Sequence, residues 1–166
     1  MNIRPITQND ALEFLNMQHG LDKSSSYMLL EPGERIATVE DTVRRIDQIL
    51  TAKDFLFVAI DDTGAIGGYL QAERAAFNKI QHSAYIVIGL LPSIQGKGLG
   101  TMLFEELDRW AEKMGVTRLE LTVVTVNEGA VALYKKSGFE IEGTKRKAIY
   151  QDGRFLDEYY MSKIFD

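Results

Sequence analysis

The sequence predicts an α/β protein in which helices flank a mixed, mostly antiparallel sheet of about seven strands. Apolar segments rich in β-branched and aromatic residues alternate along the chain with amphipathic segments of helical period. Near the middle, the strand SAYIVIGLL (83–91) is followed by a helix from about Gly98 to Met114 and by the strand RLELTVVTV (118–126). Because a crossover helix joins parallel strands, the sheet is expected to contain a parallel pair at its centre.

The N-terminal segment predicts a strand followed by a helix. NIRPI (2–6) looks like the strand, and Thr7 is a typical helix N-cap with Asp10 three residues later. The segment 22–35 is rich in Ser, Pro and Gly, so we expect a loop there.

A second helix and a hairpin are expected next. Thr38 predicts the N-cap of the helix. Its apolar residues recur at helical spacing and should share one face: Val43, Ile46, Ile49 and Leu50. The segment 55–75 then reads as two apolar strands joined at 61–64, where Asp-Asp-Thr-Gly predicts a turn.

The C-terminal third predicts a helix and a closing hairpin. Gly115 should end the central helix, and a further helix is expected over about 128–137. The segment 142–164 reads as two strands that turn at Asp152-Gly153. With 45% hydrophobic residues, 166 residues are enough for one core, so we expect a single domain over 1–166.

Composition narrows the functional classes. A net charge of −5 argues against nucleic acid as a partner, because a nucleic-acid-binding surface is basic and clustered. The chain has no cysteine, so it offers neither a disulfide framework nor a thiolate for metal binding or nucleophilic catalysis, and we expect no metal. The longest apolar stretch, AYIVIGLL, is far shorter than the roughly 18 residues that a membrane span needs. A cytoplasmic protein without a membrane partner is therefore expected.

The segment PSIQGKGLGTMLFEEL (92–107) places three glycines at the predicted junction of a strand and a helix. Such a turn offers free backbone N–H groups and the positive end of a helix dipole to an anion, typically a phosphate. The spacing fits neither a Walker loop, which needs Ser or Thr at Gly98, nor a dinucleotide fingerprint, which needs glycine at Thr101. From the residues alone, a simple connector stays an equal alternative.

Two motifs resemble those of the GNAT acyl-CoA N-acyltransferase superfamily. QGKGLG (95–100) is similar to the family signature Q/R-x-x-G-x-G/A at the junction of a strand and a helix. NEGAVALYKKSGFE (127–140) resembles the downstream segment N-x-x-A-x-x-L-Y-x-x-x-G-F. Their spacing and the order of the predicted elements are similar to the family over nearly the whole chain, so the resemblance implies the GNAT fold, with a splay between its two parallel strands.

The resemblance also implies acetyl-CoA as co-substrate and assigns the residues that bind it. The pantetheine arm would pair with main chain in the strand before the turn and contact Asn127, and Tyr134 would lie beside the coenzyme sulfur. The expected cofactor-binding residues are Ile88, Gly89, Leu90, Gln95, Gly96, Lys97, Gly98, Leu99, Gly100, Asn127 and Tyr134.

The implied mechanism is direct attack of a neutral amine on the acyl thioester, with a thiolate as leaving group. Tyr134 would assist that thiolate. Many relatives place a glutamate on the strand before the glycine turn, but SAYIVIGLL contains no acid. Glu73, Glu31 and a water chain are therefore the candidates for accepting the proton of the amine.

The expected acceptor is the primary amine of a small molecule such as a polyamine or an amino compound, since acidic residues in 31–41 would suit a cation. Two alternatives stay open. The protein could acetylate protein or peptide N-termini, or it could bind acyl-CoA as a sensor without turnover. The oligomeric state is also open, with a homodimer as one alternative.

Overall fold

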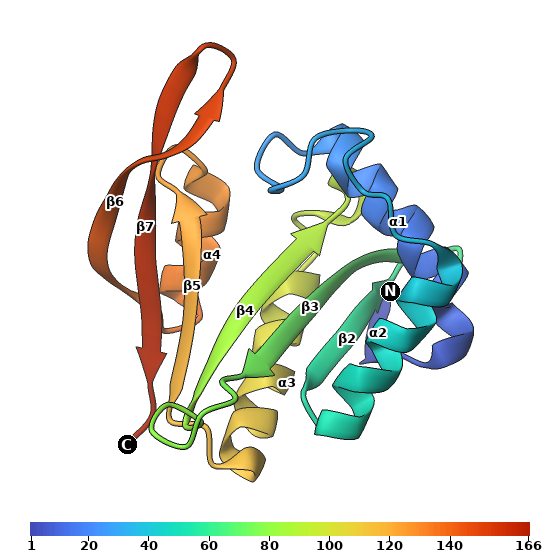
Figure 1. Ribbon diagram of the computed structural model, residues 1–166, viewed down its shortest axis with the longest axis horizontal. Coiled ribbons are helices and arrows are strands. Elements are labelled where there is room, and N and C mark those ends of the chain that lie inside the picture. The colour runs from blue at the N-terminus through green and yellow to red at the C-terminus, as the bar shows by residue number, and fades with distance from the viewer. The chain divides into compact units, whose positions relative to one another are not determined.

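The computed structural model describes residues 1–166 and confirms the predicted fold class. The elements follow in the order β1 (Asn2–Pro5), η1 (Gln8–Asp10), α1 (Ala11–Ser24), α2 (Val39–Ala52), β2 (Phe55–Ile60), β3 (Ile66–Arg74), β4 (Ser83–Leu90), η2 (Pro92–Ile94), α3 (Leu99–Met114), β5 (Arg118–Val124), α4 (Glu128–Lys136), β6 (Glu140–Gln151) and β7 (Arg154–Ile164). Seven strands form a mostly antiparallel sheet in the order β1-β2-β3-β4-β5-β7-β6, with β4 and β5 as its parallel pair (Figure 1). None of the helices has the length and hydropathy of a membrane-spanning segment.

The chain divides into two compact units, and each is built from two segments. The first unit comprises 1–73 and 87–107, and the second unit comprises 74–86 and 108–166. The first unit therefore holds the glycine-rich turn, whereas the second unit holds the predicted Asn127 and Tyr134.

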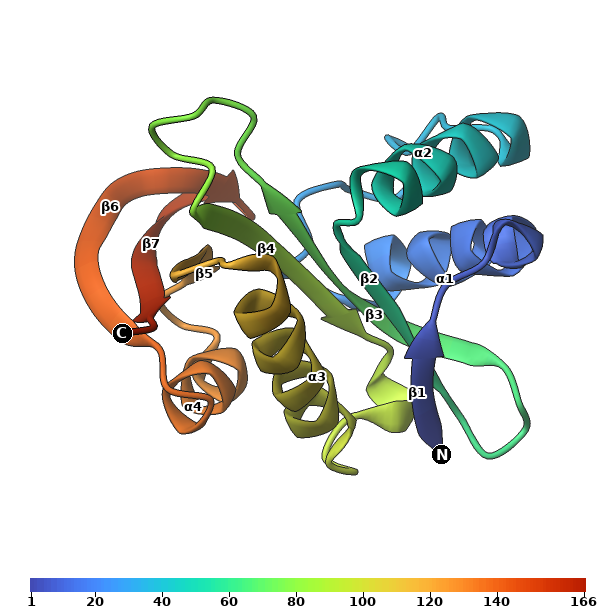
Figure 2. The ribbon, with the colours of Figure 1, turned by 90° about the horizontal axis from the view of Figure 1, so that it is seen from below.

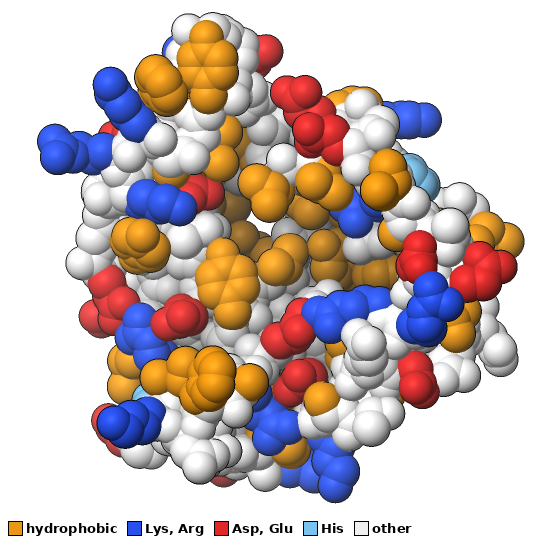
Figure 3. Space-filling view, in the orientation of Figure 1, with side chains coloured by type: hydrophobic (Ala, Val, Ile, Leu, Met, Phe, Trp, Pro, Cys, Tyr) orange, Lys and Arg blue, Asp and Glu red, His pale blue; other side chains and the backbone are white.

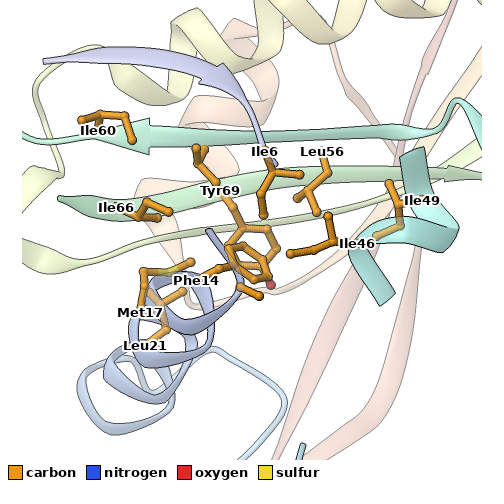
Figure 4. Close-up of a cluster of buried hydrophobic side chains, with 12 residues drawn as sticks. Ile6, Phe14, Met17, Leu21, Ile46, Ile49, Leu56, Ile60, Ile66 and Tyr69 are labelled. Atoms are coloured by element: carbon orange, nitrogen blue, oxygen red, sulfur yellow. The ribbon is translucent and has the colours of Figure 1, made fainter. Parts of the chain in front are cut away.

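In the first unit, α1 and α2 lie on the same side of β2 and β3 (Figure 2). Their apolar faces close a buried cluster with these strands, in which the rings of Phe14 and Tyr69 meet edge to face at 5.2 Å (Figure 4). Burial of such side chains is the main favourable term in folding. The members of the cluster labelled in Figure 4 are Ile6, Phe14, Met17, Leu21, Ile46, Ile49, Leu56, Ile60, Ile66 and Tyr69.

Of the two predicted helix starts in the first unit, Thr38 is confirmed as the N-cap of α2. Thr7 instead caps the short helix η1, and α1 begins at Ala11 with Asp10 as its N-cap. At α2 the Thr38 hydroxyl accepts the Asp41 N–H at 3.1 Å, and the Asp41 carboxylate accepts the Thr38 N–H at 2.9 Å. The predicted loop starts too early, because α1 runs to Ser24 and its Asp22 is held by an ion pair with Arg35. Leu50 is 41% exposed, because it lies at the edge of the apolar face rather than over the core.

The second unit contains the long hairpin of β6 and β7. Asp152 and Gly153 form its turn with φ of 50° and 75°, as the sequence predicts. Two register shifts interrupt the pairing of β6 with β7, and β6 is strongly curved (Figure 2). Hydrophobic side chains gather at the hairpin tip, at the top of Figure 3, where Tyr150 and Phe155 are exposed.

Candidate functional site

The glycine-rich turn of the first unit leads from η2 into α3. Gly96 and Gly98 have φ of 71° and 81°, a left-handed backbone conformation that residues with a Cβ rarely adopt. A Cβ added at either glycine would meet no atom within 4 Å. The conformation of the turn, and not packing within the protein, therefore requires glycine here, and the space above the turn is open to a ligand.

This turn presents a continuous row of hydrogen-bond donors. The backbone N–H groups of 96–98 have no hydrogen-bond partner in the protein. The first helical bond of α3 runs from the Met102 N–H to the Gly98 carbonyl at 3.1 Å, so the N–H groups of 99–101 also lack an intrahelical acceptor. Free donors at the positive end of a helix dipole make an anion-binding site.

Two hydrogen bonds fasten the turn to the strands beside it. The Gln95 side-chain amide donates to the Leu90 carbonyl at 2.8 Å, and the Leu91 N–H donates to the Gly67 carbonyl at 2.8 Å. Gly89 allows α1 to approach closely, since a Cβ there would lie 2.7 Å from the Leu21 side chain. Because Gln95 donates to it, the Leu90 carbonyl is one main-chain group of the predicted pantetheine site that already has a hydrogen-bond donor within the protein.

In the second unit, the pairing of β4 with β5 is short. It joins Ser83–Tyr85 to Arg118–Glu120, and β5 then continues to Val124 without a parallel partner. Asn127 follows the end of β5 and caps α4, its side-chain oxygen accepting the Ala130 N–H at 3.3 Å. The side chain predicted to contact the coenzyme thus also holds the start of this helix.

Tyr134 is the buried residue of α4, with 7% of its surface exposed. Its ring centroid lies 6.2 Å from that of Phe139. Burial, and to a lesser extent the proximity of Tyr85, raises the pKa of the Tyr134 hydroxyl. Tyr134 therefore stays protonated at neutral pH and can act as a hydrogen-bond donor.

A pocket of about 330 Å³ opens on the strands of the second unit. The residues that line it are Tyr85, Arg118, Glu120, Leu121, Thr122, Glu142, Tyr160 and Met161. At one side Arg118 holds two carboxylates: its Nε donates to Glu120 at 2.7 Å, and its two terminal nitrogens donate to Glu142 at 2.9 and 2.6 Å. The pocket thus combines tyrosine rings with one more negative than positive charge.

The comparison with known proteins decides the family. The model described as "Acetyltransferase (GNAT) family" matches residues 21–139. The chain belongs to the GNAT acetyltransferase family. The matched residues include QGKGLG (95–100) and residues 127–139 of the second motif.

The names of individual GNAT relatives state different substrates. The L-amino acid N-acetyltransferase AaaT of Escherichia coli is 33% identical over 105 residues, which are 61% of this chain and 63% of that protein. The spermidine N(1)-acetyltransferase of the same organism is 26% identical over 97% of this chain and 84% of its own length. The crystal structure of a GNAT acetyltransferase from Streptococcus pneumoniae superposes with a TM-score of 0.93, at 28% identity and 99% coverage of both chains.

Glu73 and Glu31, the two carboxylates predicted as candidates for accepting the proton of the amine, both lie in the first unit of this GNAT protein. Glu73 is engaged, since its carboxylate accepts hydrogen bonds from Arg45 and Gln71. Glu31 is exposed in the loop after α1.

One carboxylate of the second unit was missed by the sequence reasoning. The Glu158 side chain is only 13% exposed, and its Oε2 lies 3.9 Å from the Lys145 Nζ. Glu158 pairs with Val124 at the end of β5. The alternation along FLDEYYM could have placed it on the same face of β7 as Tyr160.

The ion pairs of Arg118 should be visible in the titration of Glu142. Hydrogen bonds from Arg118 and from the Ser162 hydroxyl lower the pKa of Glu142 from 4.5 to about 2. In an Arg118→Gln variant we expect this pKa to rise toward the ordinary value for glutamate, because the larger of the two causes is removed. Carboxylate NMR over a pH titration measures the shift, and an unchanged pKa would contradict the assignment.

Proposed function

We propose that the protein is an acetyl-CoA-dependent N-acetyltransferase that transfers an acetyl group directly to a primary amine of a small molecule, such as a polyamine or an amino compound. The observation that carries this proposal is the row of free N–H groups at the glycine turn, which suits the pyrophosphate of coenzyme A. Membership of the GNAT family supports the choice of coenzyme and of reaction.

The residues of the first unit are proposed to bind the coenzyme from pyrophosphate to pantetheine. The turn 95–100 would hold the pyrophosphate through its backbone, with Lys97, which is exposed, adding a positive charge. Main chain at 88–90 would pair with the pantetheine amides like an added strand. Since the Leu90 carbonyl already accepts Gln95, we expect the groups of Ile88 and Gly89 to supply these bonds.

The residues of the second unit are proposed to act at the other end of the coenzyme. Asn127 would contact the pantetheine arm while it caps α4. Tyr134 would donate a hydrogen bond to the sulfur as negative charge develops on the leaving thiolate. The raised pKa of Tyr134 supports this role, because the hydroxyl keeps its proton at every pH at which the enzyme is expected to work.

The amine must lose a proton to attack, since an alkylammonium has a reference pKa of about 10.4. Glu73, Glu31 and a water chain are the proposed alternatives for accepting that proton. The ion pair of Glu73 with Arg45 weakens the case for Glu73, because an engaged carboxylate has less capacity to accept a further hydrogen bond. Glu158 joins these candidates, because its shielded carboxylate belongs to a residue paired with the last residue of β5.

Acetyl-CoA is expected to stabilise the folded protein, and free coenzyme A should do much the same. A ligand that binds only the folded state at 100 times its Kd adds about 2.7 kcal/mol to the free energy of unfolding. For a chain of this size the melting temperature should then rise by about 5 °C or more. Thermal unfolding with and without millimolar acetyl-CoA measures this, and an unchanged melting temperature would count against the coenzyme site.

The activity itself is tested by the consumption of acetyl-CoA with a panel of amines. We expect turnover with at least one of four groups: polyamines, aminoglycosides, amino acids and peptide N-termini. Turnover confined to peptides would instead identify an N-terminal acetyltransferase. Tight binding of acetyl-CoA without turnover of any amine would identify a sensor.

A further inference from the structure

The pocket of the second unit carries an arrangement of charges that the transfer of an acetyl group does not require. Three charged side chains lie side by side at its edge, Arg118 between Glu120 and Glu142. The two glutamates leave one negative charge in excess. A pocket with a net negative charge attracts a cation and repels an anion.

The two carboxylates differ in the hydrogen bonds that they can still accept. Both oxygens of Glu142 are engaged, one by Arg118 and the Ser162 hydroxyl and the other by Arg118. Glu120 receives Arg118 on its Oε2, and its Oε1 has no hydrogen-bond partner. The side chain of Glu120 is 41% exposed, so Oε1 is accessible to a ligand.

Tyrosines of the two strands beside β5 line the pocket together with Glu120. Tyr85 on β4 is the parallel partner of Glu120, and Tyr160 on β7 pairs with Thr122, two residues further along β5. Each tyrosine is 46% exposed. The hydroxyls of Tyr85 and Thr122 lie 3.0 Å apart and hold the Tyr85 ring in place. Exposed aromatic faces next to a carboxylate form a site for an ammonium group.

A carboxylate ligand would meet a single cation in this pocket, and that cation is already paired with two glutamates. Arg118 is the only cationic side chain among the lining residues, and its Nε and both terminal nitrogens already donate to glutamates. The net negative charge of the pocket therefore disfavours the carboxylate of an amino acid.

The position of Glu120 along β5 relates this pocket to the proposed reaction. Glu120 precedes Val124, the last residue of the strand, by about 13 Å at the usual rise per residue. Asn127, with its proposed pantetheine contact, follows the end of the same strand. An extended diamine with one amine near the end of β5 would therefore have its second amine near Glu120.

We propose that this pocket binds the second, non-reacting ammonium group of the acceptor, through Glu120 and the rings of Tyr85 and Tyr160. The acceptor is then a long diamine or a polyamine rather than an amino acid. This inference rests on the proposed acetyltransferase activity, because only that reaction distinguishes a reacting from a non-reacting amine. The binding of a diamine can nevertheless be measured without turnover.

The test compares octamethylenediamine with octylamine, which has the same chain but one amine. For the unmodified protein we expect kcat/KM to be about tenfold or more higher for the diamine. In Glu120→Gln this advantage should disappear through a rise in KM for the diamine, with kcat unchanged. Glu120→Asp should restore part of the advantage. Glu112→Gln, an exposed glutamate of α3 outside the pocket, should change neither value.

Equilibrium dialysis of octamethylenediamine in the presence of coenzyme A separates failure of this inference from failure of the proposed function. If no amine of the panel is acetylated, but octamethylenediamine binds more tightly than octylamine and Glu120→Gln removes the difference, the pocket is confirmed and the proposed function is wrong. If both amines are acetylated with equal kcat/KM, or if Glu120→Gln keeps the advantage of the diamine, the inference is overturned and the function stands. Absence of diamine binding, together with absence of turnover for every amine of the panel, overturns both.

Discussion

The Gly98→Val variant is expected to lose coenzyme A binding while it keeps its fold. Gly98 has φ of 81°, and a β-branched residue is an outlier in that region. The backbone would move to a negative φ and turn its N–H groups away from the phosphate. Each N–H group that bonds to a charged oxygen contributes roughly 1.5–3 kcal/mol to binding. A valine side chain would also occupy space that the phosphate needs. We expect at least a 100-fold loss of affinity by isothermal titration, which corresponds to about 2.7 kcal/mol.

Gly64→Val is the matched control for this experiment. Gly64 lies in the turn between β2 and β3 of the same unit, has φ of 90° and likewise has no atom within 4 Å of an added Cβ. Its replacement imposes similar backbone strain without touching the proposed phosphate site, so affinity for coenzyme A should stay near that of the unmodified protein. Near-native affinity in a folded Gly98→Val protein would show that the turn is only a connector.

The Tyr134→Phe variant is expected to lower kcat by roughly 10²- to 10³-fold, with coenzyme binding nearly unchanged. The ring and its packing near Phe139 remain, so the coenzyme site keeps its shape. The lost group is a hydrogen-bond donor to the leaving thiolate. A phenol has a reference pKa near 10 and a thiol near 8.5, so full proton transfer from tyrosine to thiolate is uphill by about 2 kcal/mol. Burial raises the pKa of Tyr134 and makes that transfer still less favourable, which favours a hydrogen bond that strengthens in the transition state.

Steady-state and single-turnover kinetics with an active amine test the role of Tyr134. Tyr150→Phe is the control, since Tyr150 is 65% exposed at the hairpin tip, and it should leave kcat unchanged. Tyr134 should also contribute no ionisation to the pH dependence of kcat near neutrality, because its pKa is raised. If Tyr134→Phe retains full kcat when chemistry is rate-limiting, Tyr134 is a core aromatic residue and the thiolate leaves without its help.

Much of the fold could be predicted because local signals agree with the tertiary structure. Thr38 with Asp41 marks the start of α2, and the glycines at 115 and 138, with φ of 68° and 92°, lie where α3 and α4 end. The hairpin turns carry the residues that their backbone angles require. These features depend on neighbours within a few residues, which is why they can be read along the chain.

The sequence by itself determined the order of the elements, the class of the sheet and the presence of the glycine turn before a helix. Periodicity and turn chemistry are local properties, and the two motifs are contiguous. The tertiary structure alone decided the partners of charged side chains. It paired Asp22 with Arg35, engaged Glu73 with Arg45 and left Glu120 with a free oxygen in a pocket that two tyrosines line. These contacts join residues far apart in the chain, and no local pattern specifies which opposite charges meet when the strands and helices pack.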